Sequence, residues 1–338
     1  MNHLSNFRTG KAIKEALIGM PLTLSDSYID VLDRVPASDR RIVRETLILL
    51  CFGIRPLQLN ELAEAVILQE SDRDLDEDCR LSHPEVLLDI CQAFIDVNGC
   101  DVKLIHDSIR SFLTSDLIKE SKVAFFALNS EACHRSILRK CITYLSFREF
   151  AKGRVIWVHD HDWRIDHYPF VSYAALHWPI HAELTTLKPE DEQLILSFFA
   201  TKQQIKGGCF DSWVQFLIPE VFEESIARTE PLYYAASYNM VPILKLLLRP
   251  ENNVNIEQRG GRRGSTPLFV ACFRGNVEAA KLLLEAGADP DSWDRDSLGI
   301  TCRDMAASIG LDEVVGLMDE KKRKARGLAI RVRNEPRF

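Results

Sequence analysis

The chain has 338 residues, of which 46% are hydrophobic and 27% charged, and this composition is that of a globular protein with room for about two or three domains. Its formal net charge of −7 at pH 7 argues against a protein that coats nucleic acid, because such binding draws its affinity from neutralised phosphates. No apolar run is long enough to span a membrane, and no basic-then-apolar signal pattern follows Met1, so we expect no membrane partner.

Residues 1–38 are predicted to form a helical segment, and they contain a pattern that could be taken for a phosphate-binding loop. Such a loop requires G-x-x-x-x-G-K-[ST], so that backbone N–H groups cradle the phosphates and the hydroxyl holds Mg²⁺. Around Gly10-Lys11, Ser5 replaces the first glycine and Ala12 replaces the hydroxyl residue. We therefore expect no cofactor of this kind and no ATP hydrolysis by this chain.

Residues 39–118 are predicted to form a winged-helix domain. Apolar residues at helical spacing predict helices over 39–50, 59–68 and 84–90. Two β-rich runs then flank Asn98-Gly99, a pair typical of a type I′ hairpin turn because both residues tolerate a positive φ. Three helices followed by a β-hairpin indicate a winged helix.

The charges of this domain argue against DNA binding. A winged helix that reads DNA needs a recognition helix and wing rich in Arg and Lys. The helix over 59–68 instead carries Glu61 and Glu64 and no basic residue, and the loop over 70–78 is acidic. We expect a packing or regulatory module without a nucleic-acid partner.

His106, Asp107 and Ser108 are the three residue types of a hydrolase triad, but they are adjacent in sequence. Adjacent helical residues point in different directions, so we expect that these three cannot align for proton relay. Asp107 is instead expected to cap the helix that follows it. No catalytic residue is predicted here or elsewhere, and the chain is not expected to be an enzyme.

Residues 119–222 are predicted to form a helical connector, which contains the densest group of potential metal ligands. The group consists of His159, Asp160, His161, Asp162, Asp166 and His167. His-x-His spacing in a loop can chelate a metal, but no second ligand group of similar density occurs elsewhere in the chain. We expect a polar surface loop without a metal. A metal-dependent enzyme that uses the His159–His167 loop is kept as an alternative.

Residues 223–320 are predicted to form about three helix-turn-helix repeats that resemble ankyrin repeats. In the middle copy, Thr266 can cap a short helix, Gly275 ends that helix and Gly287 ends the next one. More degraded copies precede and follow it at a nearly fixed period. Because one such repeat cannot bury its own apolar face, adjacent copies predict a stacked array, and the resemblance implies protein binding.

The concave surface formed by the turn tips and first helices is the predicted binding surface, since Arg, Trp and Phe are the residue types that anchor interfaces. Tyr233 and Phe269 stand where the ankyrin family usually has a histidine. The candidate partner-binding residues are Arg262, Arg263, Phe273, Arg274, Trp293, Asp294 and Arg295.

Residues 321–338 are predicted to form a basic tail. Its run of Lys321, Lys322, Arg323 and Lys324 is either a nuclear-import signal or a solvated end that favours the negative pole of the preceding helix. Nine scattered cysteines without a C-x-x-C pair indicate buried thiols in a reducing compartment. We expect the cytoplasm, with the nucleus as the alternative.

The order of these segments resembles the part of fungal NACHT-type receptor-like proteins that follows their ATPase core. The motifs that carry the resemblance are Met20 to Tyr28, residues 104–113, Cys141 to Leu145 and Tyr173 to Trp178, ahead of the repeats. The winged helix in such proteins is of the type also found beside an inositol-deacylase domain. The resemblance implies a mainly α, non-catalytic scaffold that forms the ankyrin-repeat sensing or docking part of an NLR-like receptor. A regulatory fragment that docks onto a separate NACHT-type ATPase chain is the alternative.

Overall fold

The computed structural model describes residues 23–75, 78, 80–218, 223–292 and 299–333. Two compact units are formed. The first, the winged-helix unit, comprises Met1–Ile67 and Arg80–Cys133, and the second, the repeat unit, comprises Leu68–Cys79 and His134–Phe338. The Gly10-Lys11 pattern lies outside the described residues. No helix in these ranges is both long and apolar enough to cross a membrane.

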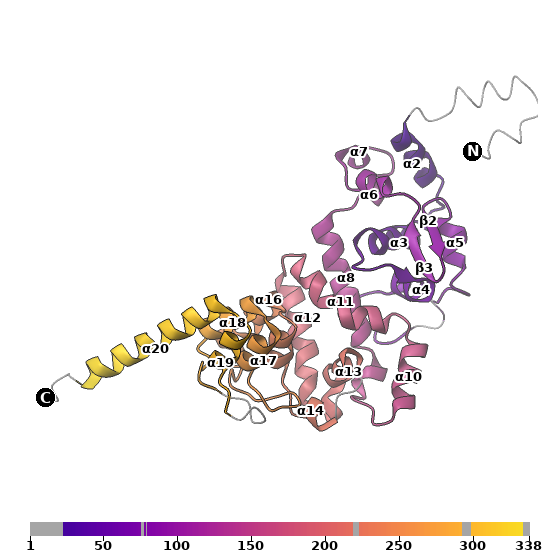
Figure 1. Ribbon diagram of the computed structural model, residues 1–338. Coiled ribbons are helices and arrows are strands. Elements are labelled where there is room, and N and C mark those ends of the chain that lie inside the picture. The colour runs from indigo at the N-terminus through magenta and orange to yellow at the C-terminus, as the bar shows by residue number, and fades with distance from the viewer. Residues whose placement is uncertain (1–22, 76–77, 79, 219–222, 293–298, 334–338) are drawn as a thin grey trace, which may run out of the picture. The chain divides into compact units, whose positions relative to one another are not determined.

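The winged-helix unit combines short helices with a small antiparallel sheet (Figure 1). The sheet has the strand order β1-β3-β2. Its elements are α2 (Leu24–Asp33), α3 (Arg40–Phe52), β1 (Leu57–Gln58), α4 (Leu59–Ile67), α5 (Val86–Cys91), β2 (Ile95–Asn98), β3 (Asp101–Leu104), α6 (Ser108–Leu113), α7 (Asp116–Lys119) and the 3-10 turn η3 (Ala124–Phe126). Val43, Leu62 and Val102, which come from three of these elements, are fully buried in its core. The predicted helices over 39–50, 59–68 and 84–90 correspond to α3, α4 and α5.

The hairpin is present, but its turn differs from the predicted one. Asn98 pairs with Asp101, so the two turn residues are Gly99 and Cys100 rather than Asn98 and Gly99. Gly99 has a φ of 67°, and Cys100 is not among the described residues with positive φ. A positive φ at the first turn position alone is typical of a type II′ turn, which requires glycine there. The type I′ prediction was therefore wrong.

The acidic residues of α4 are buried, not displayed. Glu61 is 4% exposed and Glu64 is 8% exposed. Arg55 donates two hydrogen bonds of 2.7 and 2.6 Å to the Glu61 carboxylate, and Arg80 pairs with Glu64 at 3.0 Å. These pairs offset the cost of burying charge. The recognition position of a helix-turn-helix belongs to the second helix of the pair, here α5, whose exposed charge is Asp89. Neither α4 nor α5 carries a basic residue.

The connector part of the repeat unit has an aromatic core. Trp178 and Trp213 are both almost fully buried, with ring centroids 5.6 Å apart. Its elements are α8 (Ser130–Leu145), α9 (Arg148–Ala151), α10 (Val158–His167), α11 (Val171–Glu183), α12 (Pro189–Ala200), η4 (Thr201–Gln203), η5 (Ile205–Gly207), α13 (Gly208–Leu217) and α14 (Glu223–Ala227). Large flat rings bury much apolar area with few rotatable bonds, which suits a core assembled from short helices.

The predicted polar loop at His159–His167 is instead the helix α10. Arg164 in this helix is 2% exposed. Its guanidinium donates to the carbonyl oxygens of Gly153 and Glu149 at 3.0 Å each, and it pairs with the Glu149 carboxylate at 3.2 Å. These contacts hold the charge-rich helix α10 against the rest of the connector. They join Arg164 to residues outside α10, so the sequence of the helix alone does not predict them.

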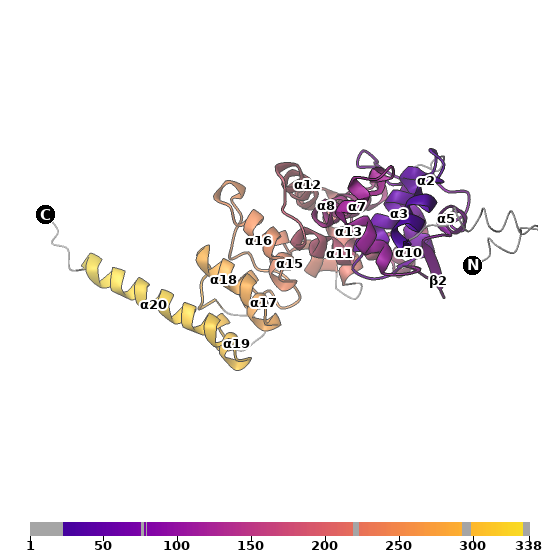
Figure 2. The same cartoon turned by 90° about the horizontal axis from the view of Figure 1, so that it is seen from above.

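Three helix pairs stack in chain order beyond the connector within the described residues (Figures 1 and 2). They are α15 (Pro231–Ser237) with α16 (Val241–Leu247), α17 (Pro267–Arg274) with α18 (Val277–Glu285), and α19 (Cys302–Ser308) with α20 (Asp312–Arg333), and η6 (Pro250–Asn252) follows α16. The first helices pack side by side, as do the second helices, and α11 packs on α16. The connector therefore covers the apolar face that the first repeat would otherwise expose.

The capping residues of the middle repeat have the predicted conformations. The Thr266 hydroxyl accepts a hydrogen bond from the Phe269 N–H at 3.3 Å, which satisfies one of the unpaired donors at the start of α17. Gly275 ends α17 with a φ of 75°, and Gly287 follows α18 with a φ of 109°. Left-handed glycines at these positions stop both helices without the strain that a side chain would add.

Candidate partner-binding surface

The turn before α17 is fixed by bonds to the preceding repeat. Gly260 and Ser265 form an antiparallel bridge that closes the turn. The Gly261 N–H donates to the Thr229 hydroxyl at 2.7 Å, and the Arg228 guanidinium donates to the Gly261 carbonyl oxygen at 2.6 Å. Because the turn is bonded on both edges, the side chains at its tip have defined positions next to α15 and α17.

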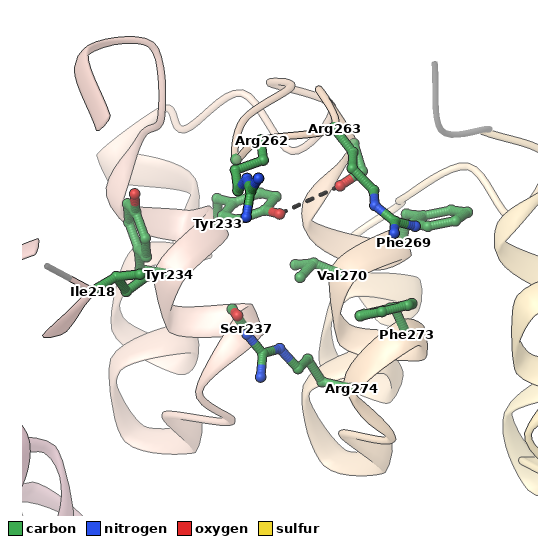
Figure 3. Close-up of a pocket in the computed structure, with 12 residues that line it drawn as sticks. Ile218, Tyr233, Tyr234, Ser237, Arg262, Arg263, Phe269, Val270, Phe273 and Arg274 are labelled. Carbon is green, nitrogen blue, oxygen red and sulfur yellow. Dashed lines mark hydrogen bonds between the residues drawn. The ribbon is translucent and has the colours of Figure 1, made fainter. Parts of the chain in front are cut away.

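A cavity of about 290 Å³ lies between this turn, α15 and α17 (Figure 3). It is lined by Ile218, Tyr233, Tyr234, Ser237, Gly261, Arg262, Arg263, Ser265, Phe269, Val270, Phe273 and Arg274. Four of the candidate partner-binding residues are among them, namely Arg262, Arg263, Phe273 and Arg274. The other three, Trp293, Asp294 and Arg295, lie outside the described residues. The structure thus gathers the described candidates around one cavity.

Several lining residues were not selected from the sequence. Tyr233 and Phe269 replace the histidine that is usual in ankyrin repeats, and the sequence does not otherwise mark them as binding residues. Both line the cavity, and the Tyr233 hydroxyl is 3.4 Å from the Ser265 hydroxyl. Their departure from the repeat pattern could have indicated a role in binding, because an aromatic ring in place of an imidazole changes the surface between neighbouring first helices. The sequence does not indicate Val270 as a binding residue, since a valine at this helix position is typical of the core of a repeat.

The cavity combines apolar walls with a cationic rim. Phe269 and Val270 are buried, whereas Phe273 is 47% exposed. The Arg263 guanidinium carbon lies 5.4 Å from the centroid of the Phe273 ring, a cation–π contact that orients both side chains. No residue among the described lining set is acidic. An exposed aromatic beside arginines is the composition that anchors protein partners.

The histidines of α10 form no metal site in the described part of the chain. His159 is exposed, whereas burial lowers the pKa of the half-buried His161. The His167 ring stacks on Trp163 at 4.8 Å between centroids. No three metal-ligating side chains come together among the described residues. As a helix, α10 also lacks the freedom with which a loop could bring His159 and His161 to one ion.

His106 and Ser108 do contact each other, contrary to expectation. The His106 Nδ1 atom lies 2.7 Å from the Ser108 hydroxyl and accepts a hydrogen bond from the Ser108 N–H at 3.1 Å. The same hydroxyl is 2.7 Å from the Tyr28 hydroxyl. Asp107, the predicted cap of α6, makes no side-chain capping bond. The imidazole therefore caps the start of α6, and the expectation that the side chains diverge was wrong for His106 and Ser108.

Residues 321–333 of the predicted basic tail belong to α20. Lys321 Nζ donates to the carbonyl oxygens of Leu284 and Ala288 at 2.8 and 2.9 Å. Lys322 pairs with Asp291, and Lys324 pairs with Glu320 at 2.8 Å. The run is thus ordered, and Lys321 in particular closes the end of α18, where unpaired carbonyl oxygens collect.

Comparison with known proteins identifies both modules. A family model for ankyrin repeats in three copies matches residues 203–294, and one described as the winged-helix domain of GPI inositol-deacylase matches residues 32–129. The chain is therefore a mainly α protein that contains a winged-helix domain and ankyrin repeats, as predicted. Ankyrin repeats are protein-interaction modules, and neither module is typically catalytic.

The curated relatives share parts of this architecture. The chain is 25% identical over 299 residues to azaphilone pigments biosynthesis cluster protein L of Monascus ruber, an alignment that covers 81% of this chain and 61% of that protein. It is 29% identical over 105 residues to the probable 26S proteasome regulatory subunit p28 of Saccharomyces cerevisiae, covering 31% of this chain and 44% of that protein. The chain thus spans less than two thirds of the length of these relatives.

Proposed function

We propose that this chain is a non-catalytic scaffold whose ankyrin repeats dock a protein partner at the cavity between α15 and α17. The observation that carries the proposal is the convergence of Arg262, Arg263, Phe273 and Arg274 on one cavity. Their turn is held by hydrogen bonds to the preceding repeat, so the surface exists before a partner arrives. Preorganisation of this kind lowers the entropy cost of binding.

The wider setting that we propose is the sensing or docking part of an NLR-like receptor. The match of residues 32–129 to a winged-helix domain supports it, together with the fungal relative named for a pigment-biosynthesis cluster. We propose a winged helix over 39–118, a connector over 119–222 and repeats over 223–320, with the connector serving as the upstream cap of the array. The ankyrin match begins at residue 203, within the proposed connector.

Affinity purification with mass spectrometry tests the docking proposal. The full chain is compared with a Phe273→Ala/Arg274→Ala double variant and with a Lys245→Ala/Ile309→Ala control, whose residues are exposed and do not line the cavity. We expect a partner that the unchanged chain and the control capture and that the double variant loses. Equal capture by all three proteins would contradict docking at this cavity.

A second candidate function is docking onto a separate NACHT-type ATPase, which the winged-helix match favours. Here an ATPase is expected among the captured proteins. Its absence from a purification that does recover a partner would contradict this candidate and leave the scaffold proposal intact.

We propose a cytoplasmic location, with nuclear import through the basic run as the alternative. A fluorescent fusion carrying Lys322→Ala, Arg323→Ala and Lys324→Ala separates the two. Lys321 is left unchanged because it bonds α18. Loss of a nuclear signal in this variant would support import, and an identical distribution would exclude it.

A further inference from the structure

Cationic side chains lie at both ends of the cavity, and apolar side chains lie between them (Figure 3). Arg262 and Arg263 project from the turn that precedes α17, and Arg274 is the last residue of that helix. Val270 lies on the helix between these ends. The helix that separates the turn from Arg274 has 8 residues at about 1.5 Å rise per residue and is therefore about 12 Å long.

Two of these arginines have no carboxylate partner within the described part of the chain. Neither Arg263 nor Arg274 forms an ion pair with a described carboxylate. Arg228 adds a further cation behind the turn, where it donates to the carbonyl oxygens of Gly261 and Arg262 at 2.6 and 3.0 Å. A concentration of positive charge in a chain whose net charge is −7 points to an anionic ligand.

We propose that this cavity binds an extended acidic peptide in which an apolar side chain stands between two carboxylates. This inference rests on the function proposed above and names the chemistry of the partner. An extended peptide rises about 3.3 Å per residue, so carboxylates four residues apart span about the length of α17. Arginine recognises a carboxylate through paired N–H donors. The intervening apolar side chain contacts Val270 and the exposed ring of Phe273.

A nucleic-acid strand fits this surface less well than an acidic peptide. Its phosphates follow one another at every nucleotide, so some would lie against Val270 and Phe269, which offer no donor. A polypeptide can instead place carboxylates at the two cationic ends and an apolar side chain between them.

Fluorescence anisotropy with the full chain tests the proposal. The probe is a labelled peptide with the core Glu-Ala-Leu-Ala-Glu between Gly-Ser flanks. The comparison peptides have Gln or Lys in place of both Glu, or Ser in place of Leu. We expect the Glu-Leu peptide to bind about tenfold more tightly than the Gln or Ser peptides, and its affinity to fall as salt is raised. We expect the Lys peptide not to bind.

Variants assign the binding to the cavity. Arg274→Ala is expected to raise Kd about tenfold, and Lys245→Ala, a cation that does not line the cavity, is expected to leave it unchanged. Circular dichroism of each variant checks that it is folded. Equal loss from both variants, or no loss from Arg274→Ala, would overturn the proposal.

The remaining outcomes separate this inference from the docking function. If the Gln or Lys peptide binds as well as the Glu peptide and Phe273→Ala abolishes that binding, the docking function survives and the acidic ligand is wrong. Preferential binding of a phosphothreonine peptide or of a single-stranded oligonucleotide would likewise reject the acidic peptide. If no peptide responds to a substitution in the cavity and no captured partner does either, both proposals fail.

Discussion

Lys321 Nζ donates a hydrogen bond of 2.8 Å to the carbonyl oxygen of Leu284, and so ties the second helix of the third repeat to the end of the second repeat. A further bond of 2.9 Å reaches the Ala288 carbonyl oxygen. The ammonium lies among carbonyl oxygens at the negative end of α18, where a cation is favoured. The residue that could be taken for part of an import signal is therefore an interrepeat cap.

We expect Lys321→Ala to lower the free energy of unfolding of the repeat unit by about 1–3 kcal/mol, because charge-assisted hydrogen bonds contribute about that much. Lys324→Ala is the control, since Lys324 pairs with Glu320 at the surface of its own helix. Urea denaturation followed by tryptophan fluorescence is the measurement. All five tryptophans, at positions 157, 163, 178, 213 and 293, belong to the repeat unit, so the signal reports on that unit. Equal midpoints for both variants would show that the cap contributes nothing.

Gly261 is expected to be essential for the shape of the binding surface. It has a φ of 66°, and a Cβ there would lie 2.2 Å from the Tyr233 hydroxyl oxygen. Gly261→Ala therefore adds backbone strain of about 1 kcal/mol and also displaces the turn that carries Arg262 and Arg263. We expect loss of partner or peptide binding from a protein that still folds.

Gly310→Ala is the matched control for this substitution. Gly310 has a φ of 77°, but nothing lies within 4 Å of a Cβ at that position. Its variant carries the same type of strain without the collision, and we expect it to bind as the unchanged protein does. Binding assays and thermal melts of both variants make the comparison. Similar binding by both would mean that the turn tolerates displacement.

The local signals of the repeat were readable from the sequence, whereas its long-range contacts were not. Thr266, Gly275 and Gly287 act within a few residues of their own positions, so their roles follow from residue type and spacing. Arg164 is held by Glu149 of another helix and by the Gly153 carbonyl oxygen, and a helix at α10 could not be predicted from local residues. Lys321 reaches a repeat that precedes it in the chain, and its sequence context shows only a basic run.

The candidate surface was predictable to a similar degree. Repeat register places Arg262 and Phe273 on exposed positions, because that assignment needs only the period of the array. The cavity itself depends on how the side chains of two neighbouring repeats meet. Tyr233 and Val270 line it through that packing, which has no counterpart in a single repeat's sequence.

Asp211 is expected to be the most sensitive charged residue of the connector. It is fully buried, and its carboxylate pairs with Lys202 and Arg154 at 2.8 Å each. Asp211→Asn leaves both cations with a neutral partner, and breaking such a buried pair costs about 3–5 kcal/mol.

The control is Glu278→Gln, which removes an exposed partner of Lys281 and is expected to cost less than about 1 kcal/mol. Urea midpoints from tryptophan fluorescence compare the two. A loss of stability no larger for Asp211→Asn than for Glu278→Gln would contradict the assigned role.

Acid is expected to destabilise the repeat unit through His181. The imidazole is fully buried, its Nδ1 lies 2.9 Å from His134 Nδ1, and its Nε2 lies 2.9 Å from the Tyr173 hydroxyl oxygen. Burial, followed by the charges of His134 and His177, lowers the pKa of His181 from 6.5 to about 3. Between pH 6.5 and 3 the unfolded chain therefore binds a proton at this histidine that the folded chain does not. The stabilisation from neutral His181 is present above pH 6.5. It is lost as the pH falls towards 3, by about 1.4 kcal/mol per pH unit.

His181→Gln should flatten the dependence of the urea midpoint on pH between these limits, because glutamine does not titrate. His159→Gln, at an exposed position, should leave that dependence as steep as in the unchanged protein, and an unaltered slope in His181→Gln would place the acid sensitivity on another group.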